Sequence, residues 1–244
     1  MRTFGIQTFT IRKEMKDDLD LSIKKIRDLG IKQIEGARMP IDQHTIEVLK
    51  KNRIDVLSLQ LTYHKLVHRE QEIIRFCKEM KTKHVIISVL PLWARVPLCG
   101  YTLFASKVNE LISRYEKVGI EVSFHHHDYE MKKTKQGLIL DRILKHINPK
   151  LGLIIDTYWI TKMKQDPIDI YLKYKNRIKG MHLREYGKSG QHYPIGEGTV
   201  DFKTILNTID QHVYTVIEQK TDSPFQDIKK ALTHLEEINE SKAV

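Results

Sequence analysis

Eight short apolar segments recur along the chain, and each ends near a polar residue before a stretch with helical spacing. The segments are 4–7, 33–36, 56–61, 84–90, 121–127, 151–156, 178–183 and 214–219. They lie about 30 residues apart, which is the size of one strand–helix unit. Eight such units in 244 residues, without a Gly/Ser/Pro-rich linker, predict one domain over residues 1–244. The predicted fold is α/β, a closed (β/α)₈ TIM barrel.

The connecting stretches have the patterns of amphipathic helices. In one of them, Leu19, Ile23, Ile26 and Leu29 recur at helical spacing, and Gly30 then ends the helix. A doubly wound open sheet is the alternative, but no glycine-rich phosphate-binding turn follows the first apolar segment. The long stretch 89–103 is predicted to be a loop that covers the barrel mouth.

Composition narrows the class of partner. Lys and Arg number 41 against 31 Asp and Glu, and the lysines are dispersed among acids. This mixed pattern favours a solvated surface over a nucleic-acid interface. The two cysteines, Cys77 and Cys99, form no disulfide framework. No stretch approaches the roughly 18 apolar residues of a membrane helix, and the first residues lack a secretory apolar region, so a cytoplasmic protein without a membrane segment is expected.

Polar residues that end the apolar segments are expected to meet at the barrel mouth, because barrel chemistry sits at the carboxyl ends of the strands. Because successive side chains of a strand point to opposite faces, His125 and His127 are expected on the inner face of their strand and His126 on the outer face, toward helices or solvent. Four residues on successive strands then converge: His125, Asp156, His182 and Glu218. Two imidazoles and two carboxylates suit Mn²⁺, Zn²⁺, Co²⁺ or Fe²⁺ better than Ca²⁺. One divalent ion, with Mg²⁺ also considered, is the expected cofactor.

Each of these residues also has a purely structural interpretation. Asp156 is a candidate helix N-cap, His182 a candidate hydrogen-bonded core histidine, and Glu218 a candidate salt-bridge partner. Four such groups on consecutive strands are hard to explain as packing, because burying them unpaired is costly. A shared cation is the simplest compensation.

The motifs resemble those of a known family, over nearly the whole chain. GIQTFTIRKEM is similar to GLQLYSVRDEL, GIKQIEGA to GYKGVEFA, and VSFHHHDYEM to YHNHDYEF. LIIDTYW, MHLREY, PIGEGTVDF and VIEQ are similar to D-x-x-W, HLKD, IGEGxIDF and VEQD. In this order they resemble the xylose isomerase-like TIM barrels, specifically the sugar phosphate isomerase/epimerase group.

The resemblance implies a divalent metal held by Glu, Asp, His and Glu on four strands. Asp156, His182 and Glu218 match the last three positions, whereas His125 stands where many epimerases carry glutamate. The two-glutamate proton shuttle of those epimerases is therefore left open. Glu185 and Lys220 stand where the HLKD and VEQD motifs carry aspartate, which points to a different substrate.

The resemblance implies an isomerase or epimerase of a sugar, keto-sugar or sugar phosphate. Such chemistry needs a metal that polarises an oxygen and groups that take and return a proton. Glu218 is the expected base, and His125 or His127 the opposite acid or base. We expect Gln7, Glu35, His64, Trp93, Arg184 and Lys220 to bind substrate.

Several of these residues have equal structural alternatives. For Glu35 the alternative is a structural hydrogen bond, and for Trp93 it is loop packing. Arg184 and Lys220 suit a phosphate or an enolate, but a salt bridge to Glu185 or Glu218 is an equal alternative. Glu130 is expected to be exposed rather than to orient a histidine.

Three rival functions remain. A dehydratase or lyase of a keto-sugar or inosose would use the same site. An endonuclease IV-type AP endonuclease fits the net charge of +10, but its three-zinc cluster needs about nine ligands, no histidine follows Asp156, and Gly190 replaces an expected Asp near His192. A non-catalytic sugar-binding relative is the third. The expected partner is a small sugar or sugar phosphate rather than nucleic acid, and a homodimer is left open.

Overall fold

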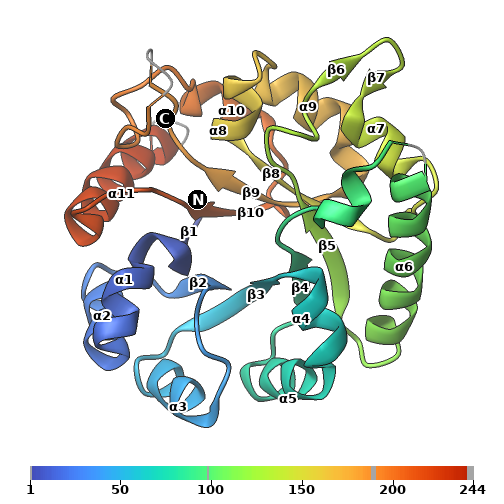
Figure 1. The fold of residues 1–244 in the computed structure, drawn as a ribbon. Coiled ribbons are helices and arrows are strands. Elements are labelled where there is room, and N and C mark those ends of the chain that lie inside the picture. The colour runs from blue at the N-terminus through green and yellow to red at the C-terminus, as the bar shows by residue number, and fades with distance from the viewer. Residues whose placement is uncertain (1, 98, 188–190, 241–244) are drawn as a thin grey trace.

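The computed structural model describes residues 2–97, 99–187 and 191–240. Eight parallel strands close into a barrel in the order β1-β10-β9-β8-β5-β4-β3-β2, and the helices surround it (Figure 1). The strands are β1 Phe4–Gln7, β2 Gln33–Ala37, β3 Asp55–Leu61, β4 His84–Ile87, β5 Glu121–His125, β8 Gly152–Asp156, β9 Ile178–Leu183 and β10 Tyr214–Ile217. The predicted single-domain (β/α)₈ barrel is confirmed.

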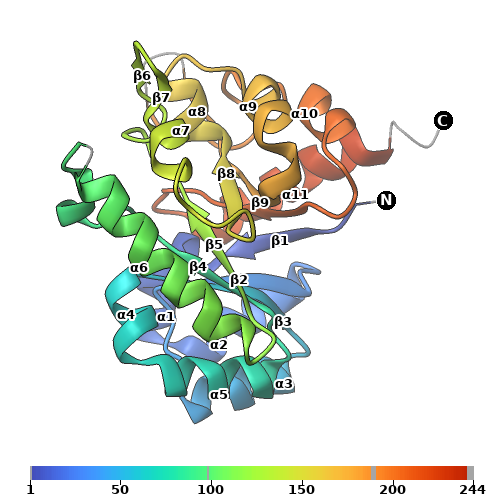
Figure 2. The ribbon, with the colours of Figure 1, turned by 90° about the vertical axis from the view of Figure 1, so that its right-hand side faces the viewer.

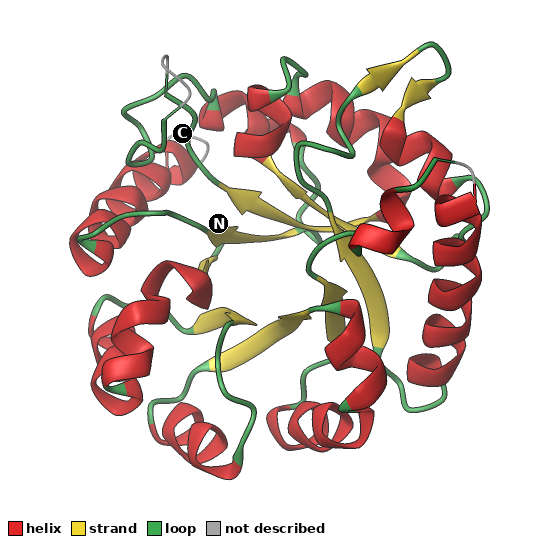
Figure 3. Cartoon of the chain, viewed as in Figure 1, coloured by secondary structure: helices red, strands yellow, loops and turns green. Residues whose placement is uncertain are grey.

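The helices lie between consecutive strands and outside the barrel, as the side view and the cartoon also show (Figures 2 and 3). They are α1 Arg12–Asp17, α2 Leu19–Asp28, α3 Gln43–Lys51, α4 Tyr63–His68, α5 Glu70–Met80, α6 Cys99–Glu116, α7 Ile139–Leu144, α8 Thr157–Lys162, α9 Pro167–Tyr174, α10 Phe202–Thr208 and α11 Pro224–Glu240. Short 3₁₀ turns cover Thr8–Ile11, Leu92–Arg95 and Lys175–Arg177. No helix in the described ranges is long and apolar enough to span a bilayer.

Two local predictions need correction. The stretch 89–103 is not one loop, because it contains a 3₁₀ turn and the first residues of α6. Tyr101, Phe104 and Ala105 are buried, and their spacing continues the apolar stripe of the helix. A small hairpin was also missed: β6 Lys133–Thr134 pairs with β7 Gly137–Leu138. Strands of two residues are too short to show alternation.

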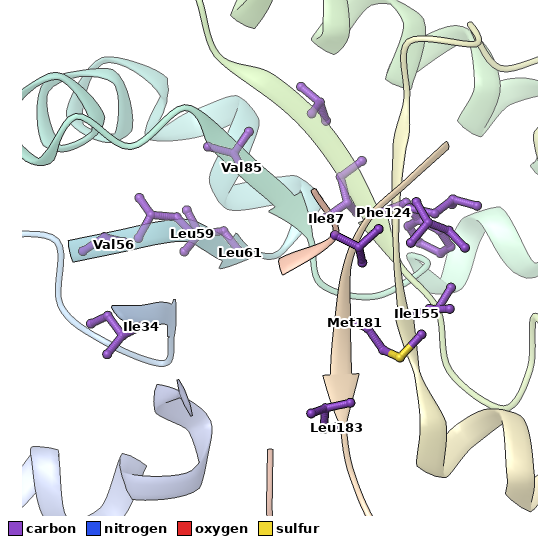
Figure 4. Close-up of a cluster of buried hydrophobic side chains, with 14 of the residues drawn as sticks. Ile34, Val56, Leu59, Leu61, Val85, Ile87, Phe124, Ile155, Met181 and Leu183 are labelled. Carbon is purple, nitrogen blue, oxygen red and sulfur yellow. The ribbon is translucent and has the colours of Figure 1, made fainter. Parts of the chain in front are cut away.

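The strands separate an apolar layer from a polar interior. Side chains such as Val85, Phe124 and Met181 are buried in the apolar cluster between the strands and the helices (Figure 4). On the inner side, a Cβ at Gly180 would lie 2.4 Å from the ring of Tyr214. The ring therefore occupies the barrel interior, and its hydroxyl donates to Oε2 of Glu35, on the next strand but one, at 2.9 Å.

Two threonines join the first turn of the chain to its neighbours. Thr8 Oγ1 donates to the carbonyl of Ala37 and accepts from the Ala37 N–H, both at 2.7 Å. Thr10 Oγ1 accepts from the N–H of Gln219 at 3.0 Å. These contacts fix the turn after β1 against the ends of β2 and β10, where the sequence predicts the functional residues.

We predict that Thr8→Val lowers the free energy of unfolding. The change keeps the shape of the side chain but leaves two buried backbone groups of Ala37 without partners, at a cost of about 1–3 kcal/mol. Urea denaturation measures the difference. Thr233→Val, the same change at an exposed position on α11, is the control, and equal stability of the two variants would contradict the interpretation.

Candidate metal centre at the barrel mouth

Four metal-capable side chains meet at the carboxyl ends of neighbouring strands. His125 and Asp156 are the last residues of β5 and β8, His182 lies in β9, and Glu218 follows β10. Asp156 and His182 are direct register partners. One potential ligand atom from each residue lies within 4.8 Å of the others, and all four side chains are buried. The predicted convergence is thus present.

The donor set fits a divalent metal. Both ring nitrogens of His125 are buried without a hydrogen-bond partner, and Nε2 lies 3.7 Å from Oδ2 of Asp156. A buried polar nitrogen without a partner is costly, and a cation that accepts its lone pair would remove that cost. Two nitrogen and two carboxylate donors suit Mn²⁺, Zn²⁺, Co²⁺ or Fe²⁺. The cluster can therefore hold such an ion.

Asp156 has two tasks in this arrangement. Its Oδ1 accepts from the N–H groups of Tyr158 and Trp159 at 2.8 and 3.2 Å, which makes it the N-cap of α8. Its Oδ2 faces His125 and Arg184. The structural interpretation of Asp156 as a cap is therefore correct, and it leaves one oxygen free for a ligand role.

Arg184 places a positive charge beside the two carboxylates. Its Nη1 lies 3.0 Å from Oε1 of Glu218 and 3.5 Å from Oδ2 of Asp156. Its guanidinium carbon lies 4.6 Å from the ring centre of Tyr158. Burial raises the pKa of Glu218, but Arg184 and His182 outweigh it and hold that pKa well below its ordinary value. The side chain of Glu218 is therefore a carboxylate at neutral pH.

The alternative salt bridge between Arg184 and Glu185 does not form in the described structure. Glu185 is buried and instead accepts from the backbone N–H groups of Tyr186, Gly196 and Val200, at 2.9–3.1 Å. It holds the loop after β9 in place. Arg184 is thus left to face the cluster.

His182 lies between two carboxylates. Its Nδ1 is 2.9 Å from Oε2 of Glu218, and its Nε2 is 2.8 Å from Oε1 of Glu35, though without good hydrogen-bond geometry. Burial lowers the pKa of His182, but Glu35 and Glu218 outweigh it and raise the value to about 10. Ser58 and Tyr214 each donate to Oε2 of Glu35 at 2.9 Å. Glu35 is therefore fixed beneath His182 by structural hydrogen bonds.

The three consecutive histidines have different roles. His125 belongs to the cluster, whereas His127 lines the cavity above it, with its ring 5.3 Å from that of Trp159. His126 is fully buried rather than exposed to solvent, and its Nε2 accepts the backbone N–H of Asp156 at 3.1 Å. Burial lowers the pKa of all three to about 3. They are neutral at physiological pH.

The prediction that Glu130 is exposed is wrong. Its side chain is completely buried, and Oε2 accepts the backbone N–H of His127 at 2.7 Å. Burial raises its pKa. The turn after β5 brings Glu130 back to the backbone of His127, three residues earlier, and the charge of Glu130 alone does not reveal that it is buried there. Glu130 thus positions the segment that carries His127.

A cavity of about 500 Å³ opens above the cluster. Of the predicted site residues it is lined by Gln7, His125, His127, Arg184, Glu218 and Lys220. Its lining also includes Arg38, Lys65, Trp159 and His192, which were not predicted. Trp159 stands at the W of the D-x-x-W motif, and Arg38 directly follows β2, so these two had a signal in the sequence.

Glu35, His64 and Trp93, which were predicted to bind substrate, are not among the lining residues. His64 is exposed on α4 and its ring lies 4.2 Å from that of His68. Trp93 packs against Tyr63, with the ring centres 6.0 Å apart. Loop packing is therefore the better description of Trp93.

The described residues contain one cluster of metal-capable groups, with four members. His192 lies outside it and contacts Arg184, with 3.3 Å between its Nδ1 and Nη2. Gly190, where a further ligand was considered, lies outside the described residues. A three-zinc site with about nine ligands finds no support here.

Comparisons with known proteins agree on the architecture. The family model described as xylose isomerase-like TIM barrel matches residues 23–238. Among solved structures, a sugar phosphate isomerase/epimerase from Parabacteroides distasonis superposes with a TM-score of 0.76 at 17% identity, over 96% of this chain and 93% of that one. The probable 3-DHS dehydratase AsbF of Bacillus anthracis gives 0.77 at 13% identity, over 96% and 98%. At these identities the structures show the fold.

Some curated relatives match this chain over only part of their length. The inosose dehydratase of Lacticaseibacillus casei is 26% identical over 158 residues, 54% of this chain and 52% of that protein. The chain thus spans about half the length of the first curated relatives it matches. The inosose dehydratase of Clostridium beijerinckii is 24% identical over an alignment of 274 positions, gaps included, which covers 91% of this chain and 90% of that protein.

We predict that Mn²⁺ stabilises the protein and that Asp156→Asn abolishes this effect. An asparagine keeps the helix cap but removes the charge that attracts the ion. At a hundred times the dissociation constant, Mn²⁺ should add about 2.7 kcal/mol, measured by thermal unfolding with and without chelator.

Asp166→Asn is the matched control, because Asp166 caps α9 through the N–H groups of Ile168 and Asp169 on the exposed surface. Elemental analysis gives a second readout. A wild-type protein that neither takes up nor responds to Mn²⁺, Zn²⁺ or Co²⁺ would contradict the metal site.

We also predict that the metal-free protein loses stability as pH falls. The folded-state pKa of His126 is about 3, below the unfolded value of about 6.5. The unfolded state therefore binds the proton first, so stability is complete above pH 6.5 and is lost from there toward pH 3.

His126→Gln keeps an acceptor for Asp156 but does not titrate. Between pH 6 and 4, the free energy of unfolding of this variant should fall less steeply than that of the wild type. The two slopes should differ by about 1.4 kcal/mol per pH unit. His212→Gln, at an exposed position, is the control, and the same slope in both variants would rule out a buried neutral His126.

Proposed function

Because the chain belongs to the xylose isomerase-like TIM barrel family, we propose that it is a divalent-metal-dependent enzyme of keto-sugars or keto-cyclitols. It takes a proton from the carbon beside the substrate carbonyl. The observation that carries this proposal is the buried cluster of two histidines and two carboxylates directly beneath the cavity. The names of the curated relatives support the class of substrate.

His125, Asp156, His182 and Glu218 would hold the metal. When bound, the ion would supply positive charge that polarises a carbonyl or hydroxyl oxygen. Glu218 is the proposed base, since it is the one acidic side chain among the described residues that line the cavity. Its partners His182 and Arg184 keep it ionised and hold it in place.

Dehydration is the outcome that the arrangement supports best. Glu218 takes the proton from carbon, and the C–H electron pair becomes the C=C bond of an enolate. The C–O bond of the neighbouring carbon then breaks, and the hydroxyl leaves with a proton as water. Glu218 can return the proton that it has taken to the leaving hydroxyl, so one carboxylate suffices, and His127, a neutral imidazole that lines the cavity, is proposed to hold that hydroxyl by a hydrogen bond.

Isomerisation or epimerisation, which the sequence motifs favour, is the second candidate. An epimerase needs an acid or base on each face of the substrate. His125 replaces the usual glutamate, but the cavity offers two other imidazoles, His127 and His192. This observation keeps a second proton-transfer group available.

We predict that a metal-supplemented screen of ketoses, sugar phosphates and inososes in D₂O identifies a substrate. A dehydrated product is lighter by one water, whereas an isomer or epimer keeps the mass apart from deuterium taken up beside the carbonyl. Mass spectrometry and NMR separate these outcomes. Absence of both exchange and product across the panel would instead favour a sugar-binding protein.

Single substitutions distinguish residues that bind the metal from residues that act only in turnover. His127→Gln keeps all four proposed ligands, so we expect unchanged metal content and a turnover lower by about tenfold, the effect of one weakened hydrogen bond. Glu218→Gln should lose both turnover and part of the metal affinity. Glu197→Gln, at an exposed position on the loop after β9, should behave as wild type. Full activity of Glu218→Gln would sink the proposed base.

A further inference from the structure

The cavity has two chemically different halves. The metal-capable residues come from β5, β8, β9 and the end of β10. Three lining cations belong to the other side of the ring: Arg38 follows β2, Lys65 lies on α4 after β3, and Lys220 follows β10. Since β10, β1, β2 and β3 are consecutive neighbours in the barrel, these cations share one half of the mouth, and β10, which is followed by both Glu218 and Lys220, is its boundary with the other half.

The three cations have no acidic partner in the part of the chain that the structure describes. None of them takes part in an ion pair there, although many other surface lysines do. The cavity's acidic lining residue, Glu218, is already engaged by Arg184 and His182. Like charges around one cavity repel each other and together attract an anion, more strongly at low salt.

Arg38 also has an unusual backbone. Its φ is +57°, in the left-handed region that a side chain with a Cβ disfavours. Three other non-glycine residues among those described have a positive φ: Arg53, Lys81 and Lys164. All three lie at helix ends, where this conformation completes a cap. Arg38 follows a strand, so no cap explains it. Strain of this sort is typical of functional sites.

Gln7 at the end of β1 and Gln60 in β3 line the cavity on the same side as the three cations. The Gln7 amide donates to Oε1 of Gln60 and, at 3.3 Å, to Oε1 of Glu35. Oε1 of Gln7 is buried without a hydrogen-bond partner. A substrate hydroxyl would satisfy this acceptor. The cavity therefore offers a metal-capable side and a cationic side that also carries hydrogen-bonding amides.

We propose that the substrate carries an anionic group, a carboxylate or a phosphate, which binds to Arg38, Lys65 and Lys220. Its hydroxyls then lie against Gln7 and Gln60, and its carbonyl end lies at His125, Asp156, His182 and Glu218. The orientation of the carbonyl end rests on the function proposed above. The anion subsite itself does not, because it depends only on binding.

Calorimetric titration tests the subsite with two matched pairs of probes: ribose 5-phosphate against ribose, and galacturonate against galactose. We expect at least one anionic probe to bind the Mn²⁺-supplemented wild type at least about tenfold more tightly than its neutral partner. The preference should shrink as NaCl rises, because salt screens exposed charges. The pair with the larger preference identifies phosphate or carboxylate.

The triple variant Arg38→Gln, Lys65→Gln, Lys220→Gln should bind both members of each pair equally. The control Lys32→Gln, Lys83→Gln, Lys117→Gln removes the same charge at exposed positions just before β2, β4 and β5, at the opposite end of the barrel. It should keep the wild-type preference.

Equal binding of neutral and anionic probes by the wild type would overturn the subsite, as would a preference that survives in the triple variant. A preference that disappears in both triple variants would show only a general effect of net charge and would also overturn it. If the preference holds but no compound exchanges deuterium, the proposed reaction fails while the subsite stands.

Discussion

The contact between the carboxylate of Glu35 and the imidazole of His182 is the interaction on which the site depends. It joins the packed interior of the barrel to the cluster at the mouth, because Glu35 is itself held by Ser58 and Tyr214. The Tyr214 ring has room only because residue 180 is glycine. In this buried setting each polar group needs a partner, so the chain of contacts fixes one orientation of His182. To ligate a metal, His182 would have to give up a proton and its contact to one of the two carboxylates, while the other contact keeps its ring in place.

Much of the fold and the cluster could be predicted from the sequence because both follow from short-range periodicity. Alternation along each strand assigns His125 and His182 to the inner face, and barrel topology then brings them together. Glu130 and the start of α6 could not be predicted in this way. The spacing of Tyr101, Phe104 and Ala105 is compatible with a helix, but their burial, like that of Glu130, depends on which segments pack over the strand ends, and the sequence pattern does not specify that packing. The sequence leaves two acidic partners possible for Arg184, Glu185 and Glu218. The loop after β9 decides between them, because its backbone N–H groups bind the side chain of Glu185.

The histidine at position 125 changes the chemical character of the mouth. A glutamate there would place a third carboxylate beside Asp156 and Glu218, whereas a neutral imidazole leaves the negative charge to those two. Arg184 already lies against both. The arrangement therefore has one carboxylate that faces the cavity, Glu218, so the proposed reaction depends on a single carboxylate base with imidazoles beside it. This explains in physical terms why the motifs of an epimerase group and the names of dehydratases can point to the same chain.

The division of the mouth between two sets of strands also bears on how such a protein can diversify. The turns after β1, β2 and β3 supply Phe9, Arg38 and Lys65 but none of the four cluster residues. Substitutions or insertions in those turns can alter which compounds are accepted while the reactive groups on β5, β8, β9 and β10 stay in register. The residues of the cluster and most of the residues around the proposed anion subsite are therefore held by different strands, so a change in one set need not displace the other.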